Sequence, residues 1–289
     1  MSETSVLLGL FDGVHLGHRS AIDELLRQSG RKLVFTFDSG SVTSKGERGL
    51  LMTDWRKREE LLRLGADGVI SKEFSEIRDL SPEDFLDRII TGELHADRVI
   101  CGENFRFGRG GSADAGDMQR LCAPRGIDCR IVPLLYIGGE AVSSTRIRGL
   151  IESGRIEEAN SLLGYEYGFE GEVEHGFRIG SELGIKTLNL RFDLSLVLPK
   201  KGVYASEVTL SGQSFGGVTN VGTRPTVHND GRIVVETHIL GYSGDAYGEY
   251  ARVGLKKFLR EEKRFGSKEE LRQTVAGDIK AVKELFEHE

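Results

Sequence analysis

The octapeptide from Phe11 to His18, FDGVHLGH, follows the apolar run from Val6 to Leu10 without a break. An uninterrupted apolar run is typical of a buried parallel strand, so the octapeptide is predicted to turn this strand into a helix. Helix N-termini present free N–H groups and a partial positive charge, and imidazoles can donate hydrogen bonds to phosphate oxygens. The segment therefore predicts an α/β domain that binds a nucleoside triphosphate. Its predicted nucleotide contacts are Phe11, Asp12, Gly13, His15, Gly17 and His18.

Two other interpretations of the HxGH spacing are open. His15 could simply cap the helix while Gly13 and Gly17 form the turn. The same spacing also occurs in some aminoacyl-tRNA synthetases as well as in nucleotidyltransferases. The chain has no KMSKS-like lysine loop, and its charge predicts no basic surface for tRNA, which argues against a synthetase.

Length and charge narrow the classes of protein that fit. A chain of 289 residues with 38% hydrophobic content is long enough for two cores. A net charge of −6 disfavours nucleic acid and anionic membranes as partners, and no run of about 18 apolar residues occurs. Three cysteines without a CxxC pair predict reduced thiols. We expect a cytoplasmic protein with small-molecule partners; the oligomeric state is left open.

The first part of the chain alternates short apolar runs with helical spacing, which predicts a doubly wound, Rossmann-like α/β domain over residues 1–164. The predicted strands are residues 6–11, 32–37, 68–71, 98–101 and 130–134. The predicted helices are residues 19–28, 55–64, 82–90, 116–122, 144–153 and 156–163. Ser81 and Pro82 form a helix start in which serine caps and proline takes the first turn.

After Gly164 the pattern changes to strand-like segments separated by glycine turns. Six such segments predict an antiparallel β-barrel in a second domain, residues 165–289. They are residues 171–173, 188–192, 202–209, 215–221, 232–240 and 250–258. A capping box at Ser267 to Glu270 and apolar residues at helical intervals predict a C-terminal helix that covers the barrel.

Two further segments of the first domain can carry chemistry. Asn104, Phe105, Arg106 and Phe107 follow a predicted strand, where parallel sheets place their ligands, and could hold a planar ring and a phosphate. The alternative is that the two aromatic rings belong to the core. The segment SSTRIR opens a helix with hydroxyl groups and continues with cations, which suits a pyrophosphate. Its predicted nucleotide contacts are Ser144, Thr145 and Arg148.

In the barrel, alternation along a strand places Thr187 and Asn189 on one face as neutral oxygen donors. Such a pair suits Mg²⁺ that is held mostly by water and phosphate. Glu236 is an acid within an apolar strand and could serve as a general base, or could face solvent without a role. The predicted nucleotide contacts of the barrel are Gly184, Lys186, Thr187 and Asn189, with Thr187 and Asn189 also predicted as metal ligands.

The order of motifs resembles that of the prokaryotic bifunctional flavokinases and FMN adenylyltransferases, also called FAD synthetases, over essentially the whole chain. The motifs that carry the resemblance are FDGVHLGH, LMTDWRKREELLRLGAD, GENFRFG, SSTRIRGLI, the G-x-x-T-x-N-L segment, NVGTRPT, VETHIL, DAYGEY and FLREEKRF. The resemblance implies that the first domain transfers AMP from ATP to FMN and that the barrel phosphorylates riboflavin, both with Mg²⁺.

The resemblance also implies roles for single residues. His15 and His18 would act at the phosphates, with Ser144, Thr145 and Arg148 around them. Asn104 to Phe107 would lie near the flavin. In the barrel, Glu236 would be the catalytic base, and Arg260 would contact flavin from a closing segment.

The chain departs from the family pattern at three places. Phe37-Asp38-Ser39-Gly40-Ser41 lacks the usual Pro-His-Pro histidine, Tyr165-Glu166 replaces an Arg-Pro, and Lys186-Thr187-Leu188-Asn189 replaces Pro-Thr-Ala-Asn. Lys186 adds a cation near the predicted phosphates, and Leu188 enlarges a small position. Two alternatives follow. The chain could retain one activity, with adenylyl transfer favoured, or it could be a flavin-binding regulator without turnover.

Overall fold

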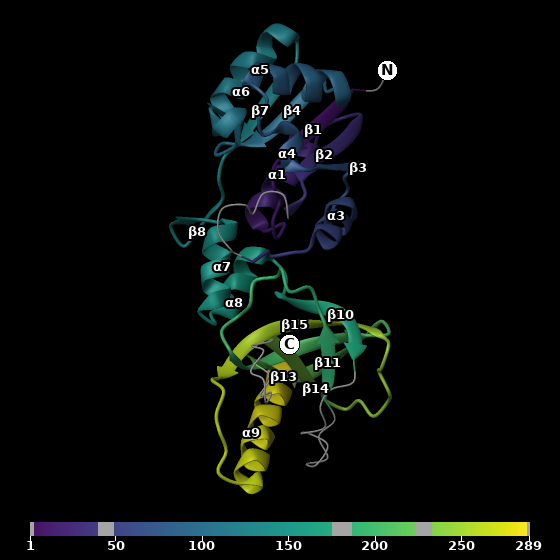
Figure 1. Ribbon diagram of the computed structural model, residues 1–289, viewed down its shortest axis with the longest axis vertical. Coiled ribbons are helices and arrows are strands. Elements are labelled where there is room, and N and C mark those ends of the chain that lie inside the picture. Colours follow the sequence, from purple (N-terminus) through teal and green to yellow (C-terminus); the bar gives the residue numbers. More distant parts are fainter. Residues whose placement is uncertain (1–2, 40–48, 175–186, 224–232, 288–289) are drawn as a thin grey trace. The chain divides into compact units, whose positions relative to one another are not determined.

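The computed structural model describes residues 3–39, 49–174, 187–223 and 233–287. It divides into two compact units, Met1–Arg146 and Ile147–Glu289 (Figure 1). This division lies before the predicted boundary at residue 164, because most of the helix over 144–152 and the whole helix over 156–163 group with the second unit. Within the described part of the chain, no helix has the length and apolar character needed to cross a membrane.

The first unit is built on a five-stranded parallel sheet (Figure 1). Its strands are β1 (Thr4–Leu8), β2 (Arg31–Phe37), β3 (Gly68–Lys72), β4 (Arg98–Gly102) and β7 (Asp128–Val132). Their order is β3-β2-β1-β4-β7, so the direction of winding reverses between β1 and β4. In open α/β sheets, ligands bind outside the carboxyl ends of the strands at this switch point. The doubly wound prediction is confirmed.

The helices of the first unit follow the strands; the short helix Phe74–Ile77 was not predicted, and two predicted helices differ from their expected form. They are α1 (Leu16–Leu26), α3 (Asp54–Arg63), α4 (Phe74–Ile77), α5 (Pro82–Asp84), the π-helix η1 (Phe85–Glu93) and α6 (Ala115–Cys122). Helix α1 begins at Leu16 rather than residue 19, because His15 caps it. The helix predicted at 82–90 is instead a single α-helical turn that continues as the π-helix η1. The apolar spacing did not predict the i→i+5 hydrogen bonds of a π-helix.

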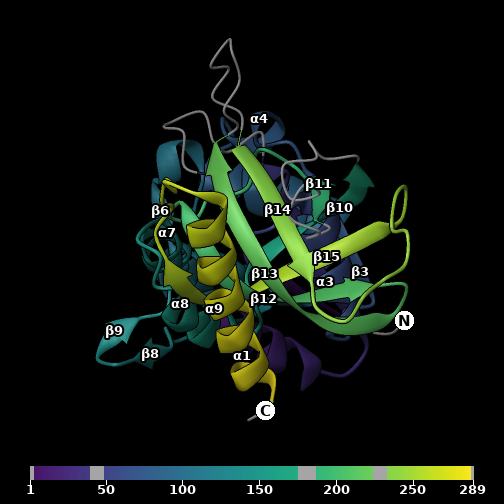
Figure 2. The ribbon, with the colours of Figure 1, turned by 90° about the horizontal axis from the view of Figure 1, so that it is seen from below.

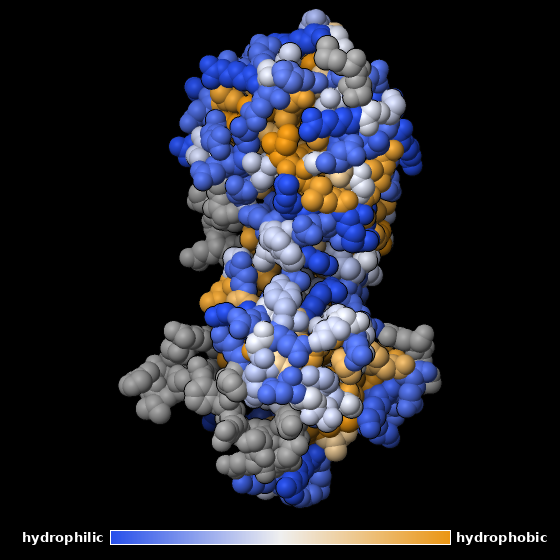
Figure 3. Space-filling view, turned by 90° about the vertical axis from the view of Figure 1, so that its right-hand side faces the viewer, coloured by the Kyte–Doolittle hydropathy of each residue, from blue (hydrophilic) through white to orange (hydrophobic). Residues whose placement is uncertain are grey.

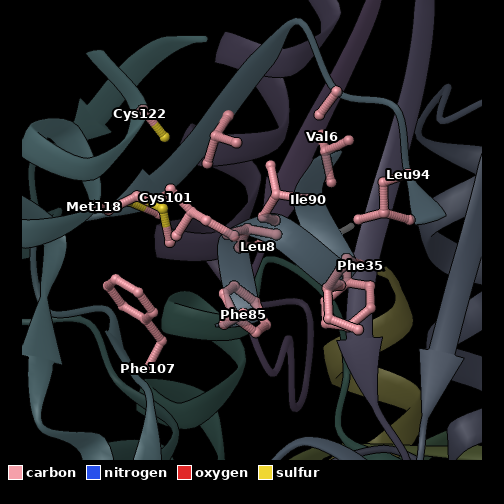
Figure 4. Close-up of a cluster of buried hydrophobic side chains, with 14 of the residues drawn as sticks. Val6, Leu8, Phe35, Phe85, Ile90, Leu94, Cys101, Phe107, Met118 and Cys122 are labelled. Carbon is pink, nitrogen blue, oxygen red and sulfur yellow. The ribbon is translucent and has the colours of Figure 1, made fainter. Parts of the chain in front are cut away.

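The remaining elements of the first unit are short. They are β5 (Arg106–Phe107), β6 (Ala113–Asp114), β8 (Tyr136–Ile137), β9 (Glu140–Ala141) and the 3₁₀ turns η2 (Arg109–Gly111) and η3 (Ala123–Arg125). One face of the sheet packs against η1 and α6 in an apolar cluster that includes Leu8, Phe35, Phe85 and Cys101 (Figure 4). This burial fixes the strands whose ends carry the candidate site.

The second unit contains a closed barrel of six antiparallel strands, as predicted. The strands are β10 (Gly168–Glu174), β11 (Leu188–Arg191), β12 (Gly202–Leu210), β13 (Gln213–Thr223), β14 (Ile233–Ile239) and β15 (Tyr250–Arg260). They pair in the order β10-β11-β14-β13-β12-β15, and β15 closes the barrel on β10. Before the barrel come α7 (Ser144–Glu152), which crosses the division between the units, and α8 (Ile156–Leu163).

The C-terminal helix α9 (Lys268–Glu287) packs against β12 and β13 (Figure 2). Val282 of α9 lies in an apolar cluster with Val203 and Val218 of these strands. The Ser267 hydroxyl accepts a hydrogen bond from the Glu270 amide, as the capping box predicts, but the Glu270 carboxylate accepts from Gly266 rather than Ser267. On the face in Figure 3, hydrophilic residues predominate in both units, with apolar residues scattered among them.

Candidate active sites

The turn after β1 has an unusual backbone. Phe11 and Val14 have φ angles of 53° and 38°, and Gly13 between them has 82°. Left-handed φ is unfavourable for residues other than glycine, above all for β-branched valine. Both side chains are nevertheless buried, with exposures of 2% and 0%. The packed surroundings therefore hold a strained turn at the switch point of the sheet.

His15 and His18 lie face to face directly after this turn. Their ring centroids are 3.6 Å apart and the planes differ by 15°. The His15 Nδ1 accepts a hydrogen bond from the His18 amide at 3.3 Å, so a neutral His15 carries its proton on Nε2. Gly17 allows this approach, because a Cβ there would lie 3.2 Å from the His15 ring and 3.4 Å from the Val142 carbonyl. His15 thus caps α1 through its Nδ1.

His18 is held in its uncharged form. Burial, the neighbouring His15 and the charge of Lys57 lower the pKa of His18 well below its usual value. Phe11 covers the ring edge-on at 5.3 Å, and the buried Nδ1 of His18 has no hydrogen-bond partner in the described part of the chain. A buried polar atom without a partner is costly, so this nitrogen is available for a ligand.

Two hydrogen bonds tie neighbouring segments to the turn. Asp12, which is buried, accepts a hydrogen bond from the Leu51 amide at 2.9 Å, and the Ser144 hydroxyl donates to the Asp12 carbonyl at 2.9 Å. Ser144 thereby brings the start of α7 to the β1 turn. The exposed Thr145 follows it in the first turn of α7, and Arg148 lies one turn further along. Their nucleotide contacts stay predictions.

The loop after β4 lies at the other side of the switch point. The Phe105 amide donates to the Gly102 carbonyl at 3.0 Å, forming a turn in which Asn104 and Arg106 are exposed. Phe107 is only 6% exposed and packs in the core against Phe85, with ring centroids 5.6 Å apart. Half-buried Phe105 stacks on Phe107 at 5.9 Å. Phe107 therefore anchors the loop in the core. The side chains of Asn104, Phe105 and Arg106 remain able to contact a ligand.

Ser39, where the family histidine is missing, belongs to a buried polar network. Its hydroxyl donates to Asp54 at 2.7 Å, and the Lys57 ammonium donates to Ser39 at 3.3 Å and to the Phe37 carbonyl at 2.8 Å. Lys57 also pairs with Asp54 at 2.8 Å. The lysine, 2% exposed, thus fixes the carboxyl end of β2. Gly40 and Ser41 lie outside the described residues.

The barrel places four site residues in one cross-strand row. Asn189 on β11 is the register partner of Glu236 on β14, and Glu236 is the partner of Asn220 on β13. Asn220 in turn faces Val203 on β12, which faces Arg260 on β15. Register partners project to the same side of a sheet. Because Val203 packs against α9, the row lies on the outer face of the barrel beside that helix.

Glu236 is half-buried between two amides. The Nδ2 of Asn189 is buried and has no hydrogen-bond partner among the described residues. Thr187 lies two residues before Asn189, so an extended chain places it on the same side. Leu188 pairs with Thr237, is 5% exposed and projects to the opposite face, so its bulk is directed away from the row. Gly184 and Lys186 lie outside the described residues.

Arg260 ends the row and holds α9. Its guanidinium donates to both carboxylate oxygens of Asp278, at 3.0 and 2.8 Å. Asp278 is 7% exposed, so the pair is largely shielded from water. Close by, the Glu262 carboxylate occupies the space where a Cβ on Gly222 would lie. The predicted flavin contact of Arg260 stays a prediction, and in the structure its guanidinium ties β15 to α9.

Metal binding would rely on oxygen donors rather than on a preformed cage. Within the described ranges, no group of three or more His, Cys, Asp or Glu side chains could hold a metal ion. A hydroxyl at Thr187 and an amide oxygen at Asn189 fit Mg²⁺ that arrives with ATP and keeps phosphate and water ligands. The unpartnered Asn189 amide fits the same interpretation, since a phosphate oxygen could accept from it.

Sequence patterns did not single out Asn220, Lys57 or Asp278. Asn220 opens the NVGTRPT motif, whose sequence assigns a role to none of its residues. Lys57 sits among other charged residues on α3, where its burial has no signature in the sequence. Asp278 is a charged residue at a position of α9 where the helical spacing of Val275 and Val282 predicts an apolar one, and this is the signal that could have identified it.

Comparisons with known proteins agree with both halves of the chain. The family model described as FAD synthetase matches residues 1–146, and the model described as riboflavin kinase matches residues 163–286. Bifunctional riboflavin kinase/FMN adenylyltransferases from Listeria monocytogenes and Escherichia coli K12 are 32% and 34% identical. Each alignment covers 96% of this chain and 91% of the relative. The Bacillus subtilis relative of the same name is 29% identical.

A solved structure has the same fold over nearly the whole chain. The crystal structure titled macrolide-efflux protein from Streptococcus pneumoniae aligns with a TM-score of 0.87 and 26% identity. The alignment covers 98% of this chain and 94% of that one. The pairing of a parallel-sheet unit with a closed barrel is therefore shared with a protein determined by experiment.

Proposed function

Because this chain belongs to the family of bifunctional riboflavin kinases/FMN adenylyltransferases, we propose that it makes FAD from riboflavin in two ATP-dependent steps. The barrel phosphorylates riboflavin to FMN. The first unit transfers AMP from ATP to FMN, giving FAD and pyrophosphate. Its partners are these small molecules, and the free cysteines support a cytoplasmic location.

Adenylyl transfer is supported above all by the histidine pair at the switch point of the sheet. An FMN phosphate oxygen attacks the α-phosphorus of ATP and pyrophosphate leaves, so the site must stabilise charge on phosphate oxygens. The stacked imidazoles of His15 and His18 supply hydrogen-bond donors, and the buried Nδ1 of His18 has no partner among the described residues. Amides at the start of α7 and Arg148 receive the pyrophosphate. Asn104, Phe105 and Arg106 hold the flavin.

Riboflavin phosphorylation is supported by the position of Glu236 between Asn189 and Asn220. A neutral ribityl hydroxyl must lose its proton as it attacks the γ-phosphorus, and a carboxylate can accept that proton. The two flanking amides orient the hydroxyl and a phosphate oxygen. Mg²⁺, bound with ATP at Thr187 and Asn189, would neutralise charge on the phosphates.

The two activities are tested by separating the two substrates. The full chain is incubated with Mg-ATP and either riboflavin or FMN, and the flavins are resolved by chromatography. We expect FMN followed by FAD from riboflavin, and FAD from FMN. FAD from FMN without FMN from riboflavin would leave only the adenylyltransferase. Flavin bound without either product would make the chain a binding protein.

A further inference from the structure

All three cysteines of the chain gather at one corner of the core of the first unit. Cys101 lies near the end of β4, Cys122 is the last residue of α6, and Cys129 is the second residue of β7. All three are free thiols. Figure 4 shows Cys101 and Cys122 on the same side of the apolar cluster. Neither proposed reaction uses this cluster.

The strand register places Cys129 and Cys101 on the same face of the sheet. In the parallel pair β4 and β7, Cys129 is the partner of Val99, and Cys101 lies two residues further along β4. Residues two apart on a strand project to the same face, so Cys101 and Cys129 are diagonal neighbours on one face. Cys122 reaches this face from α6, which packs on it.

The three thiols differ in exposure and in proton affinity. Cys101 and Cys122 are fully buried, whereas Cys129 is only partly buried. Hydrogen bonds from Cys101 and then from Cys122 lower the pKa of Cys129, against the opposing effects of burial and Asp128. For Cys101 and Cys122, the hydrogen bond to Cys129 and burial both raise the pKa of the thiol. The partly exposed cysteine is therefore also the one that most readily becomes a thiolate, which is the nucleophilic form.

We propose that Cys129 is an oxidation site at which a hydroperoxide starts the formation of a disulfide with Cys101. The Cys129 thiolate attacks the terminal peroxide oxygen, the O–O bond breaks, and the alkoxide leaves and is protonated to an alcohol. The Cys101 sulfur then attacks the resulting sulfenic acid. The S–S bond forms, the S–O bond breaks, and hydroxide leaves with the thiol proton as water. Two thiols are oxidised while one hydroperoxide is reduced.

Oxidation at this place acts on the neighbouring loop. Strands about 4.8 Å apart that rise about 3.3 Å per residue place diagonal Cα atoms roughly 8 Å apart. Relaxed disulfides span about 4.4–6.8 Å, so bond formation draws the end of β4 towards β7. Gly102, which directly follows Cys101, begins the loop assigned to flavin. This effect on activity rests on the proposed adenylyl transfer, whereas the oxidation itself does not.

Peptide mapping of the full chain tests the oxidation without reference to activity. The protein is treated with one equivalent of tert-butyl hydroperoxide, alkylated, digested without reduction and analysed by mass spectrometry. We expect a Cys101–Cys129 linked peptide in the wild type and in Cys122→Ala. Cys101→Ala should instead give a dimedone-trapped sulfenic acid at Cys129. Cys129→Ser should slow thiol loss at least tenfold. A Cys122–Cys129 link, or equal oxidation of all three cysteines, would overturn the proposal.

The functional consequence is measured on the same oxidised sample. FAD formation from FMN should fall several-fold and return after dithiothreitol, while FMN formation from riboflavin stays unchanged. Cys129→Ser should form FAD at the wild-type rate and resist the oxidant. If the linked peptide forms and FAD formation is unchanged, the coupling to the loop is wrong. If the reduced protein makes no FAD at all, the proposed function fails while the peptide map still decides the oxidation site.

Discussion

The two candidate sites hold their polar groups in different ways. In the first unit, a turn with left-handed Phe11 and Val14 leads to His15 and His18, which are stacked and shielded by apolar side chains. In the barrel, Glu236 is half-buried in a regular strand, and its neighbours are set by the sheet register. One site depends on strained backbone and stacked imidazoles. The other depends on an unstrained ladder and a carboxylate.

This difference follows the chemistry proposed for each site. The FMN phosphate is already an anionic nucleophile, so the first site has to supply donors and alignment, for which fixed imidazoles suffice. The ribityl hydroxyl is neutral, so the second site needs a group that accepts a proton. Two transfers from the same nucleotide therefore call for opposite kinds of side chain.

Removal of the proton acceptor should give the largest effect and should be confined to one reaction. Glu236→Gln keeps the shape of the side chain but not its basicity, so FMN formation should fall about 10²–10⁴-fold. FAD formation from FMN should stay within twofold of the wild type. Glu172→Gln on β10 makes the same change outside the row and is the matched control. Equal activity of both variants would remove Glu236 from the mechanism.

The corresponding test in the first unit removes the imidazole of His18, a proposed hydrogen-bond donor to phosphate. His18→Ala should lower FAD formation from FMN about 10²–10³-fold, as loss of one preorganised donor does elsewhere, and should spare FMN formation. Steady-state rates with each flavin measure both effects. His95→Asn changes an exposed histidine whose φ of 47° asparagine tolerates, and should leave both rates unchanged. A parallel loss of both products in folded His18→Ala would contradict separate sites.

Phe105 and Phe107, whose rings stack, have different proposed roles in the first site. Phe107 supports the loop from the core, and Phe105 contacts the flavin. Phe107→Ala should lower the free energy of unfolding by about 3–5 kcal/mol, because a buried ring leaves a cavity. Phe105→Ala should cost less stability but raise KM for FMN several-fold. Urea unfolding and FMN titration of the rate measure the two quantities. An unchanged KM in Phe105→Ala would move the flavin away from this loop.

In the barrel, the attachment of α9 should matter mostly for stability. Asp278→Asn removes the charge that receives Arg260, so the free energy of unfolding should fall by about 1.5–3 kcal/mol. Lys280→Gln on the exposed side of the same helix is the control. If Asp278→Asn also raises KM for riboflavin, the position of α9 contributes to the kinase site.

The smallest effect is expected from pH. Because burial and His15 lower the pKa of His18 in the folded state, the unfolded chain binds more protons just below the usual histidine pKa of about 6.5. The contribution of His18 to stability is therefore complete above that pH and is lost as pH falls towards its lowered folded pKa. His18→Gln should flatten the fall of stability between pH 7 and 5, measured by urea unfolding. The same fall in His18→Gln would assign it to other groups.

Local patterns were enough to predict the elements that carry both sites. Ser81 and Ser267 begin helices as their hydroxyl chemistry predicts, and the alternation around Asn189 indicated a strand. The sequence allows His15 to be either a cap or a ligand, and the structure shows that it caps α1. The family motifs placed the reactive segments in order along the chain.

Long-range placement could not be predicted in the same way. The row from Asn189 to Arg260 depends on the register of five strands, and no residue pattern within one strand encodes its partner. Burial of Lys57 depends on oxygens contributed by β2 and by Ser39, whose positions follow only from the folded chain. The contact between Cys101 and Cys129 likewise needs the pairing of β4 with β7.

Under the role proposed for Glu236, the cross-strand row makes the kinase reaction a reporter of correct folding in the barrel. A shift of β14 by one residue would turn Glu236 to the other face and present Val235 or Thr237 beside Asn189. Such a slipped strand could keep its hydrogen-bonded ladder, so circular dichroism would register little, even though Val235 and Ile239 would leave the interior. FMN formation would be absent from it. Recovery of this single activity after dilution from urea would therefore count native registers rather than compact molecules.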